Sequence, residues 1–222
     1  MNSKKIIPIF PLGLVLLPEM SLPLHIFEDR YKLMTTTCME HSMAFGIVYF
    51  IGQQLQTKGC TARIVKISKR YDDGRLDIIT HGENRFDIKE LFDEKPYLQA
   101  GVEFFDDQPE EDTDSEKLQK LAYRGIQLLK KINTKTDQYE NNRFTGRLDI
   151  KSVSFAIAAC DGFSFEEKQR FLEMTSTSQR LRKTVNALEK LLERLRITRE
   201  IERIIGGNGN LPKPLQTQLK LK

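Results

Sequence analysis

The spacing of apolar residues differs between the two halves of the chain. In residues 1–105, apolar and β-branched residues form short runs or alternate with polar residues, and turn-forming residues separate the runs. This pattern is typical of β-strands. The predicted strands are residues 6–10, 14–17, 44–50, 61–67, 76–80, 85–88 and 98–105. Many short strands with one helix predict a curled sheet or a small barrel.

Local signals add a helix and a hairpin to this half. A helix from about residue 27 to residue 40 places Tyr31, Met34 and Cys38 on one face. The pair Asp73-Gly74 lies between two strand-like runs and predicts a tight hairpin, because both turn positions need positive φ and glycine adopts it without strain.

Proline and glycine positions add further expectations. Proline cannot donate to a central ladder, so strand edges and turns are expected at Pro11, Pro18 and Pro23. Gly59 and Gly82 are expected at turns or at close approaches of the backbone.

The second half has the three- and four-residue period of helices. The apolar residues with this spacing are Leu118, Leu121, Ala122, Leu128, Leu129 and Ile132, followed by Val153, Ile157 and Cys160. The segments 164–167 and 176–179 resemble capping boxes that open two further helices. The last helix carries an apolar seam at Leu181, Val185, Leu188, Leu192 and Leu195. Fewer than three heptads favour packing in a helical bundle over an extended coiled coil.

Charge divides the chain at an acidic stretch. Residues 1–105 carry 13 basic and 13 acidic side chains, residues 106–116 carry seven acidic and no basic ones, and residues 117–222 carry 22 basic and 11 acidic ones. We therefore predict a β-rich part over 1–105, an acidic linker over 106–116, a helical part over 117–205 and a flexible basic tail over 206–222.

Motifs for catalysis and metal binding are absent from the sequence. There is no phosphate-binding G-x-x-x-x-G-K-[ST] loop, no G-x-S-x-G and no H-E-x-x-H. Cys38, Cys60 and Cys160 form no C-x-x-C pair, so we expect free thiols and no metal or cofactor. A hydrolase that uses Cys38 with His41 would depend on sequence proximity alone.

The basic second half leaves a nucleic-acid partner as an alternative. From Lys168 to Arg203, however, ten basic residues are interleaved with five acidic ones, which is typical of an ion-paired helix face. The apolar stretch 6–18 is interrupted by three prolines, and no run of about 20 apolar residues occurs, so we expect a cytoplasmic protein without a membrane span.

The run IIPIFPLGLVLLPEMSLPLHIFEDRYKLM at residues 6–34 resembles the start of the Lon substrate-binding domain, the N-terminal part of ATP-dependent Lon proteases. Further matching motifs occur in the family's order and extend the resemblance over about residues 5–200. They are Gly59-x-x-Ala62-x-Ile64, Asp73-Gly74, Gly82-x-x-Arg85-Phe86, Tyr97-Leu-x-Ala100-x-Val102, Gln169-x-x-Leu172-Glu173 and Arg180-Leu181.

This resemblance implies an α+β fold with a PUA-like β pseudo-barrel followed by a helical bundle. It also implies a non-catalytic module that binds unfolded or client polypeptides, in the manner of a quality-control adaptor, with a separate ATPase or protease as a further partner. RNA binding through the PUA-like barrel and the basic helical half is the alternative, and its binding should weaken steeply with salt.

Four residues are candidates for peptide binding in a cleft between the two parts. Phe27, Tyr31 and Phe50 would supply an apolar surface, although aromatic residues at these spacings also occur in cores. Arg85 would bind a partner carboxylate or, alternatively, hold loop carbonyls inside the fold.

Overall fold

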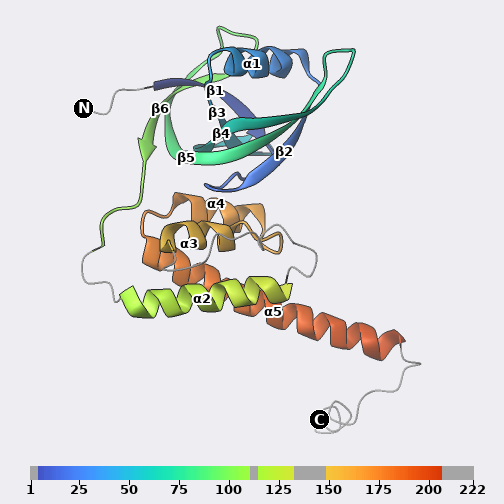
Figure 1. Ribbon diagram of the computed structural model, residues 1–222, viewed down its shortest axis with the longest axis vertical. Coiled ribbons are helices and arrows are strands. Elements are labelled where there is room, and N and C mark those ends of the chain that lie inside the picture. Colours follow the sequence, from blue (N-terminus) through green and yellow to red (C-terminus); the bar gives the residue numbers. More distant parts are fainter. Residues whose placement is uncertain (1–4, 111–114, 133–148, 207–222) are drawn as a thin grey trace.

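The computed structural model describes residues 5–110, 115–132 and 149–206 (Figure 1). Its strands are β1 (Lys5–Leu12), β2 (Ser21–Ile26), β3 (Phe45–Ile51), β4 (Gln54–Arg70), β5 (Leu76–Phe92) and β6 (Gln99–Phe105). Its helices are α1 (Asp29–Glu40), α2 (Ser115–Ile132), α3 (Ile150–Ala158), α4 (Phe165–Glu173) and α5 (Thr177–Gly206). The predicted α+β class is confirmed. Within these ranges, no helix has the length and apolar character that a membrane span needs.

The strands form one mixed sheet whose long strand β5 closes it. The order is β2-β5-β4-β3-β1-β6, and β5 also pairs with β6. The first part of β5, Leu76–His81, pairs with β2, and the later part, Arg85–Phe92, pairs with β6. Five strands therefore form a ring, and β2 is attached outside it.

The ring is closely packed because glycines admit an aromatic side chain. A Cβ on Gly46 or on Gly59 would lie 2.6 Å from Cζ of Phe86, which is fully buried. Gly59 is thus a close-approach position, as predicted.

Helix α1 covers one end of the sheet (Figure 1). Tyr31, Met34 and Cys38 are all buried, as their spacing predicts, and the Tyr31 ring stacks on Phe10 with centroids 4.0 Å apart. The helix begins at Asp29, so Phe27 precedes it.

Two strand predictions are wrong in extent. Residues 76–80 and 85–88 belong to the single strand β5, which passes through Gly82 without a break. Residues 14–17 are a buried loop rather than a strand, with Leu16 and Leu17 at 1% and 0% exposure. This loop lies against Gly82, whose Cβ position is 2.2 Å from the carbonyl oxygen of Leu17.

The three prolines expected at strand edges and turns lie where the sheet needs no backbone N–H donor. Pro18 is in a turn in which Met20 N donates to Leu17 O at 3.2 Å. Pro23 lies in the edge strand β2, and Pro11 lies in the part of β1 that pairs with β3 alone.

The hairpin between β4 and β5 differs from the predicted tight turn. Within the hairpin loop, Gly74 alone has a positive φ, of 82°. Gly74 N donates to Tyr71 O at 3.0 Å, and Tyr71 N donates to Arg75 O at 3.0 Å. The loop is therefore a three-residue turn, which needs one left-handed residue rather than two.

The helices pack around the first half of α5, which contacts both α2 and α3. In the predicted seam, Leu181, Val185 and Leu188 are fully buried, whereas Leu192 and Leu195 are half-buried. The end of α5 extends beyond the other helices (Figure 1). Both predicted helix starts are confirmed, since Ser164 Oγ accepts from Glu167 N and Ser176 Oγ accepts from Gln179 N.

The predicted linker is described in part. Residues 106–110 follow β6, and 111–114 lie outside the described residues. Of the predicted tail over 206–222, only Gly206, the last residue of α5, is described.

Candidate functional site

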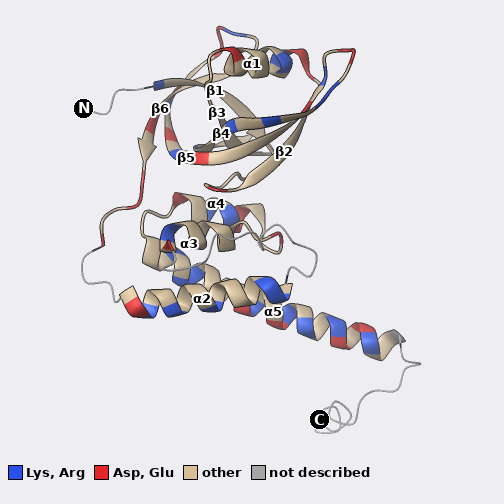
Figure 2. Ribbon diagram, in the orientation of Figure 1, with Lys and Arg blue, Asp and Glu red and all other residues tan. Residues whose placement is uncertain are grey.

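A buried ion network joins the strands to the helices. Its centre is Asp107, directly beyond β6, whose side chain is 8% exposed. Arg85 on β5 and Arg180 on α5 both contact this carboxylate, and their side chains are 2% and 0% exposed. Figure 2 shows the acidic residues that follow β6 on the segment that leads to the helices.

The two arginines also hold backbone carbonyls at the C-terminal end of α4. Arg85 donates to the carbonyls of Leu172, at 2.9 Å, and Met174. Arg180 donates to the same Met174 carbonyl at 3.0 Å. The Phe155 ring lies beneath both guanidinium groups, 3.8 Å from Arg180 and 5.2 Å from Arg85. The network therefore connects β5, α3, α4 and α5.

The environment of Asp107 keeps it ionised. Burial alone would raise the pKa of its carboxyl, but hydrogen bonds from Arg180 and Thr177 and the two arginine charges hold the pKa well below its usual value. Burial also lowers the pKa of Arg85, against the opposing effect of Asp107.

A second set of contacts joins β3 and β4 to α4. Tyr49 Oη donates to Glu166 Oε1 at 3.0 Å, and the Tyr49 ring lies 5.9 Å from the Phe165 ring. Gln169 Nε2 donates to the carbonyl of Lys58 at 3.1 Å. Direct contacts therefore join the two parts at the junction where the sequence predicts a cleft.

Exposed apolar residues are close in sequence to the residues that make these contacts. Phe50 and Ile51 follow Tyr49 at the end of β3 and are 41% and 47% exposed, and Phe165 is 42% exposed. We call Phe50, Ile51 and Phe165 the apolar edge. Phe50 and Ile51 belong to β3, and Phe165 begins α4, where its ring contacts Tyr49 of β3.

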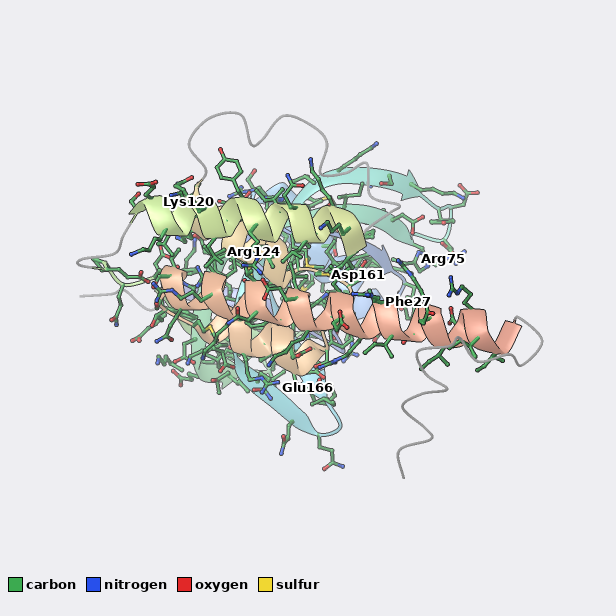
Figure 3. The ribbon with its side chains drawn as sticks, turned by 90° about the horizontal axis from the view of Figure 1, so that it is seen from below. Phe27, Arg75, Lys120, Arg124, Asp161 and Glu166 are labelled. Atoms are coloured by element: carbon green, nitrogen blue, oxygen red, sulfur yellow. The ribbon has the colours of Figure 1, made fainter. Side chains whose placement is uncertain are left out.

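Phe27 lies in a different aromatic group. It is 59% exposed and stacks on His25, whose ring meets Tyr71 edge-on. Arg75 lies over the Tyr71 ring, and His25 Nδ1 lies 2.5 Å from Asp77 Oδ1. In Figure 3, Phe27 and Arg75 lie near each other, away from Glu166.

Strand register separates Phe27 from Phe50. Ile26 pairs with Leu76 at the start of β5, whereas Phe50 pairs with Leu55, beyond the pairing of Lys58 with Asp87. The two rings therefore lie near opposite ends of the β4–β5 ladder and do not line one groove.

The remaining predicted binding residues are buried. Tyr31 is 7% exposed and lies on the buried face of α1. Arg85 donates to backbone carbonyls inside the fold, which is the second of the two roles predicted for it. Sequence reasoning missed Phe165, Ile51 and the partners of Arg85, because no local pattern distinguishes an exposed apolar residue from a core residue.

The cysteines are poorly suited to nucleophilic chemistry. Burial raises the pKa of the Cys38 thiol to about 11, and burial also raises the pKa values of the Cys60 and Cys160 thiols. His41 Nδ1 lies 3.0 Å from the carbonyl oxygen of Thr37. Among the described residues, no three His, Cys, Asp or Glu side chains are grouped to hold a metal ion.

Comparisons with known proteins place the chain among Lon sequences. The model of the family described as the ATP-dependent protease La (LON) substrate-binding domain matches residues 6–190. The chain is 24% identical over 220 residues to a Lon protease of Flavobacterium johnsoniae and 28% identical over 218 residues to Lon protease 2 of Myxococcus xanthus, each alignment covering 91% of this chain. It spans about a quarter of the length of these relatives, 26% in both cases.

Solved structures share the fold. A Lon N-terminal domain protein from Xanthomonas campestris superposes with a TM-score of 0.61 at 20% identity, covering 82% of this chain and 98% of that chain. The N-terminal domain of a Mycobacterium avium complex Lon protease superposes with a TM-score of 0.63 at 20% identity, and the match covers 83% of this chain and 98% of that chain. The RNA-binding alternative receives no support from these matches.

Proposed function

The chain belongs to the Lon substrate-binding domain family, as the sequence resemblance predicts, and on this premise we propose that it binds unfolded or client polypeptides without acting on them chemically. In this proposal it is a quality-control adaptor that presents bound polypeptides to a separate ATP-dependent protease. The family match over residues 6–190 supports the binding role.

The proposed architecture is a PUA-like pseudo-barrel over residues 1–105 and a helical bundle over 117–205. The β5–β6 pairing, which closes the sheet, supports the first part. The contacts of α5 with α2 and α3 support the second. The buried Arg85–Asp107–Arg180 network would hold the two parts at one angle.

The observation that carries the proposal is the apolar edge. Three apolar side chains between 41% and 47% exposed belong to β3 and α4, the two elements that meet where the Tyr49 ring contacts Phe165, and a polypeptide that covered them would remove their remaining surface from water. Completing the burial of one such side chain contributes about 1 kcal/mol. Such contacts select for apolar character rather than for one sequence, which suits binding of varied unfolded chains.

Fluorescence anisotropy with a labelled, carboxymethylated and permanently unfolded protein tests this proposal. We expect saturable binding that changes little between low and moderate salt, and about tenfold weaker binding for the double variant Phe50→Ser/Phe165→Ser. Phe27→Ser is the matched control, because it removes an exposed phenylalanine at the opposite end of the ladder.

Two results would overturn the proposed site. Loss of binding in Phe27→Ser with normal binding in the double variant would move the site to the His25–Phe27 group. Absence of saturable binding across several unfolded proteins would reject the polypeptide-binding function itself.

A further inference from the structure

A groove lies between the turn that precedes α4 and one face of α5. It has a volume of about 340 Å³. Its lining consists of Gly162, Phe163, Glu167, Lys183, Asn186, Ala187, Lys190, Leu191 and Arg194. The groove is distinct from the apolar edge, none of whose residues lines it.

Three cations of α5 line this groove. Lys183, Lys190 and Arg194 are all exposed. A rise of 1.5 Å per residue separates Lys183 from Lys190 by about 10 Å along the helix axis, and Lys190 from Arg194 by about 6 Å.

These cations lack the partners that other cations on the helices have. Among the described residues, no carboxylate lies within 4 Å of any of the three side-chain cations. By contrast, Arg124 on α2 lies 2.7 Å from Glu189 of α5, and Arg203 lies 3.1 Å from Glu200. Within the described ranges, the three cations of the groove are therefore without an ion pair.

The one carboxylate in the lining is already engaged. Glu167 Oε2 accepts from the backbone N of Ser164 at 2.9 Å, as part of the capping box that opens α4. This bond holds the Glu167 carboxylate at the start of α4. The carboxylate therefore forms no ion pair with the three cations of the groove.

The groove also has firmly placed apolar lining residues, Phe163, Ala187 and Leu191, which we call its floor. Phe163 is 6% exposed, and its ring packs edge-on against Phe171. A Cβ on Gly162 would lie 2.2 Å from Cδ2 of Leu191, so the turn lies directly against α5. Ala187 adds further apolar surface between the cations.

We propose that this groove docks an acidic segment of a partner protein, with carboxylates on Lys183, Lys190 and Arg194 and an apolar side chain on the floor. Residues two and three apart in an extended peptide are separated by about 7 and 10 Å, which is close to the spacing of the cations. The apolar floor and the absence of an exposed aromatic ring in the lining favour a peptide over a nucleic acid, which needs stacking surfaces.

This site goes beyond the proposed function, because it binds by charge and does not require the apolar edge. The probe is a labelled ten-residue peptide with glutamates at positions 3, 6 and 8 and leucines between them, measured by fluorescence anisotropy against the full chain. We expect saturable binding that weakens at least tenfold between 50 and 300 mM salt, and no saturable binding of the same peptide with glutamine in place of glutamate.

The matched variants are Lys190→Gln/Arg194→Gln and Arg182→Gln/Arg196→Gln. Both pairs remove two cations from exposed positions of α5, but only the first pair lines the groove. We expect the first pair to weaken peptide binding at least tenfold and the second pair to change it less than twofold. Glutamine preserves helix propensity, so both variants should fold.

Three results would overturn the proposal. They are equal losses in the two variants, equal binding of the glutamine peptide, and binding of an oligothymidine that depends on Lys190 and Arg194 in the absence of peptide binding. Phe50→Ser/Phe165→Ser should bind the acidic peptide normally, so failure of this site and failure of the apolar edge are distinguishable.

Discussion

Arg180 and Asp107, which lie 73 residues apart in the chain, form a bidentate ion pair in which Nη1 donates to Oδ1 at 2.9 Å and Nη2 donates to Oδ2. Arg85 on β5 contacts the same carboxylate, so one acidic side chain links the sheet to the last helix. Because all three groups are buried, removal of one leaves charge without compensation in a poorly solvated place.

Asp107→Asn should therefore lower the free energy of unfolding by about 3–5 kcal/mol. The asparagine keeps the shape but leaves two buried guanidinium groups without a counter-charge. Urea unfolding followed by circular dichroism measures the loss. Asp106→Asn is the control, because Asp106 is 67% exposed and its ion pairs should contribute less than about 1 kcal/mol. Equal losses in the two variants would contradict a central role for Asp107.

Stability should also fall in acid because of Asp107. Its pKa is lowered in the folded state, so the unfolded chain binds a proton more readily once the pH approaches the ordinary carboxyl value of about 3.9. The contribution of this group is complete above about pH 5 and is lost as the pH falls below about 4. Urea midpoints between pH 7 and pH 2.5 should show the gap between the parent chain and Asp107→Asn closing. A constant gap would show that the carboxylate charge is not the source of the stability.

The native thiols should react slowly. Because burial raises the pKa of Cys38 to about 11, about one thousandth of this thiol is ionised at pH 8, and its side chain is 1% exposed. We expect Ellman's reagent to label the folded protein over hours and to label three thiols within minutes in guanidinium. Rapid labelling of native Cys38 would contradict this prediction and favour a nucleophilic role.

Periodicity predicted the elements whose environment is local. The helix with Tyr31 and Cys38 on its buried face, and the capping box at Ser164, depend on contacts within a few residues. Asp107 could not be predicted in this way. Its acidic neighbours suggested a linker, whereas its partners Arg85 and Arg180 are 22 and 73 residues away in sequence.

The predicted binding residues show the same limit. Phe27 and Phe50 are exposed, but strand register places them far apart, and register depends on the whole sheet. The contact of Tyr49 with Phe165 brings together β3 and α4, more than a hundred residues apart in sequence, and no local pattern encodes it.

Gly82 fixes the buried loop at residues 14–17 to the sheet. Its N donates to Met20 O and its carbonyl accepts from Glu19 N, each at 2.9 Å. These bonds hold the loop so close that a Cβ on Gly82 would lie 2.2 Å from the Leu17 carbonyl oxygen. The atom that occupies the Cβ position of Gly82 belongs to the backbone of Leu17 rather than to the flexible end of a side chain, so it has little freedom to move.

Gly82→Ala should therefore lower the free energy of unfolding by about 3 kcal/mol, because the loop must separate from β5 and expose apolar surface. Urea unfolding measures the change. Gly13→Ala is the matched control, since nothing lies within 4 Å of its Cβ position and its φ is not in the left-handed region. The control should change stability by less than about 0.5 kcal/mol, and the lower entropy of its unfolded chain favours a small gain. Equal effects of the two substitutions would show that the loop near Leu17 yields without cost and that Gly82 is not required for close approach.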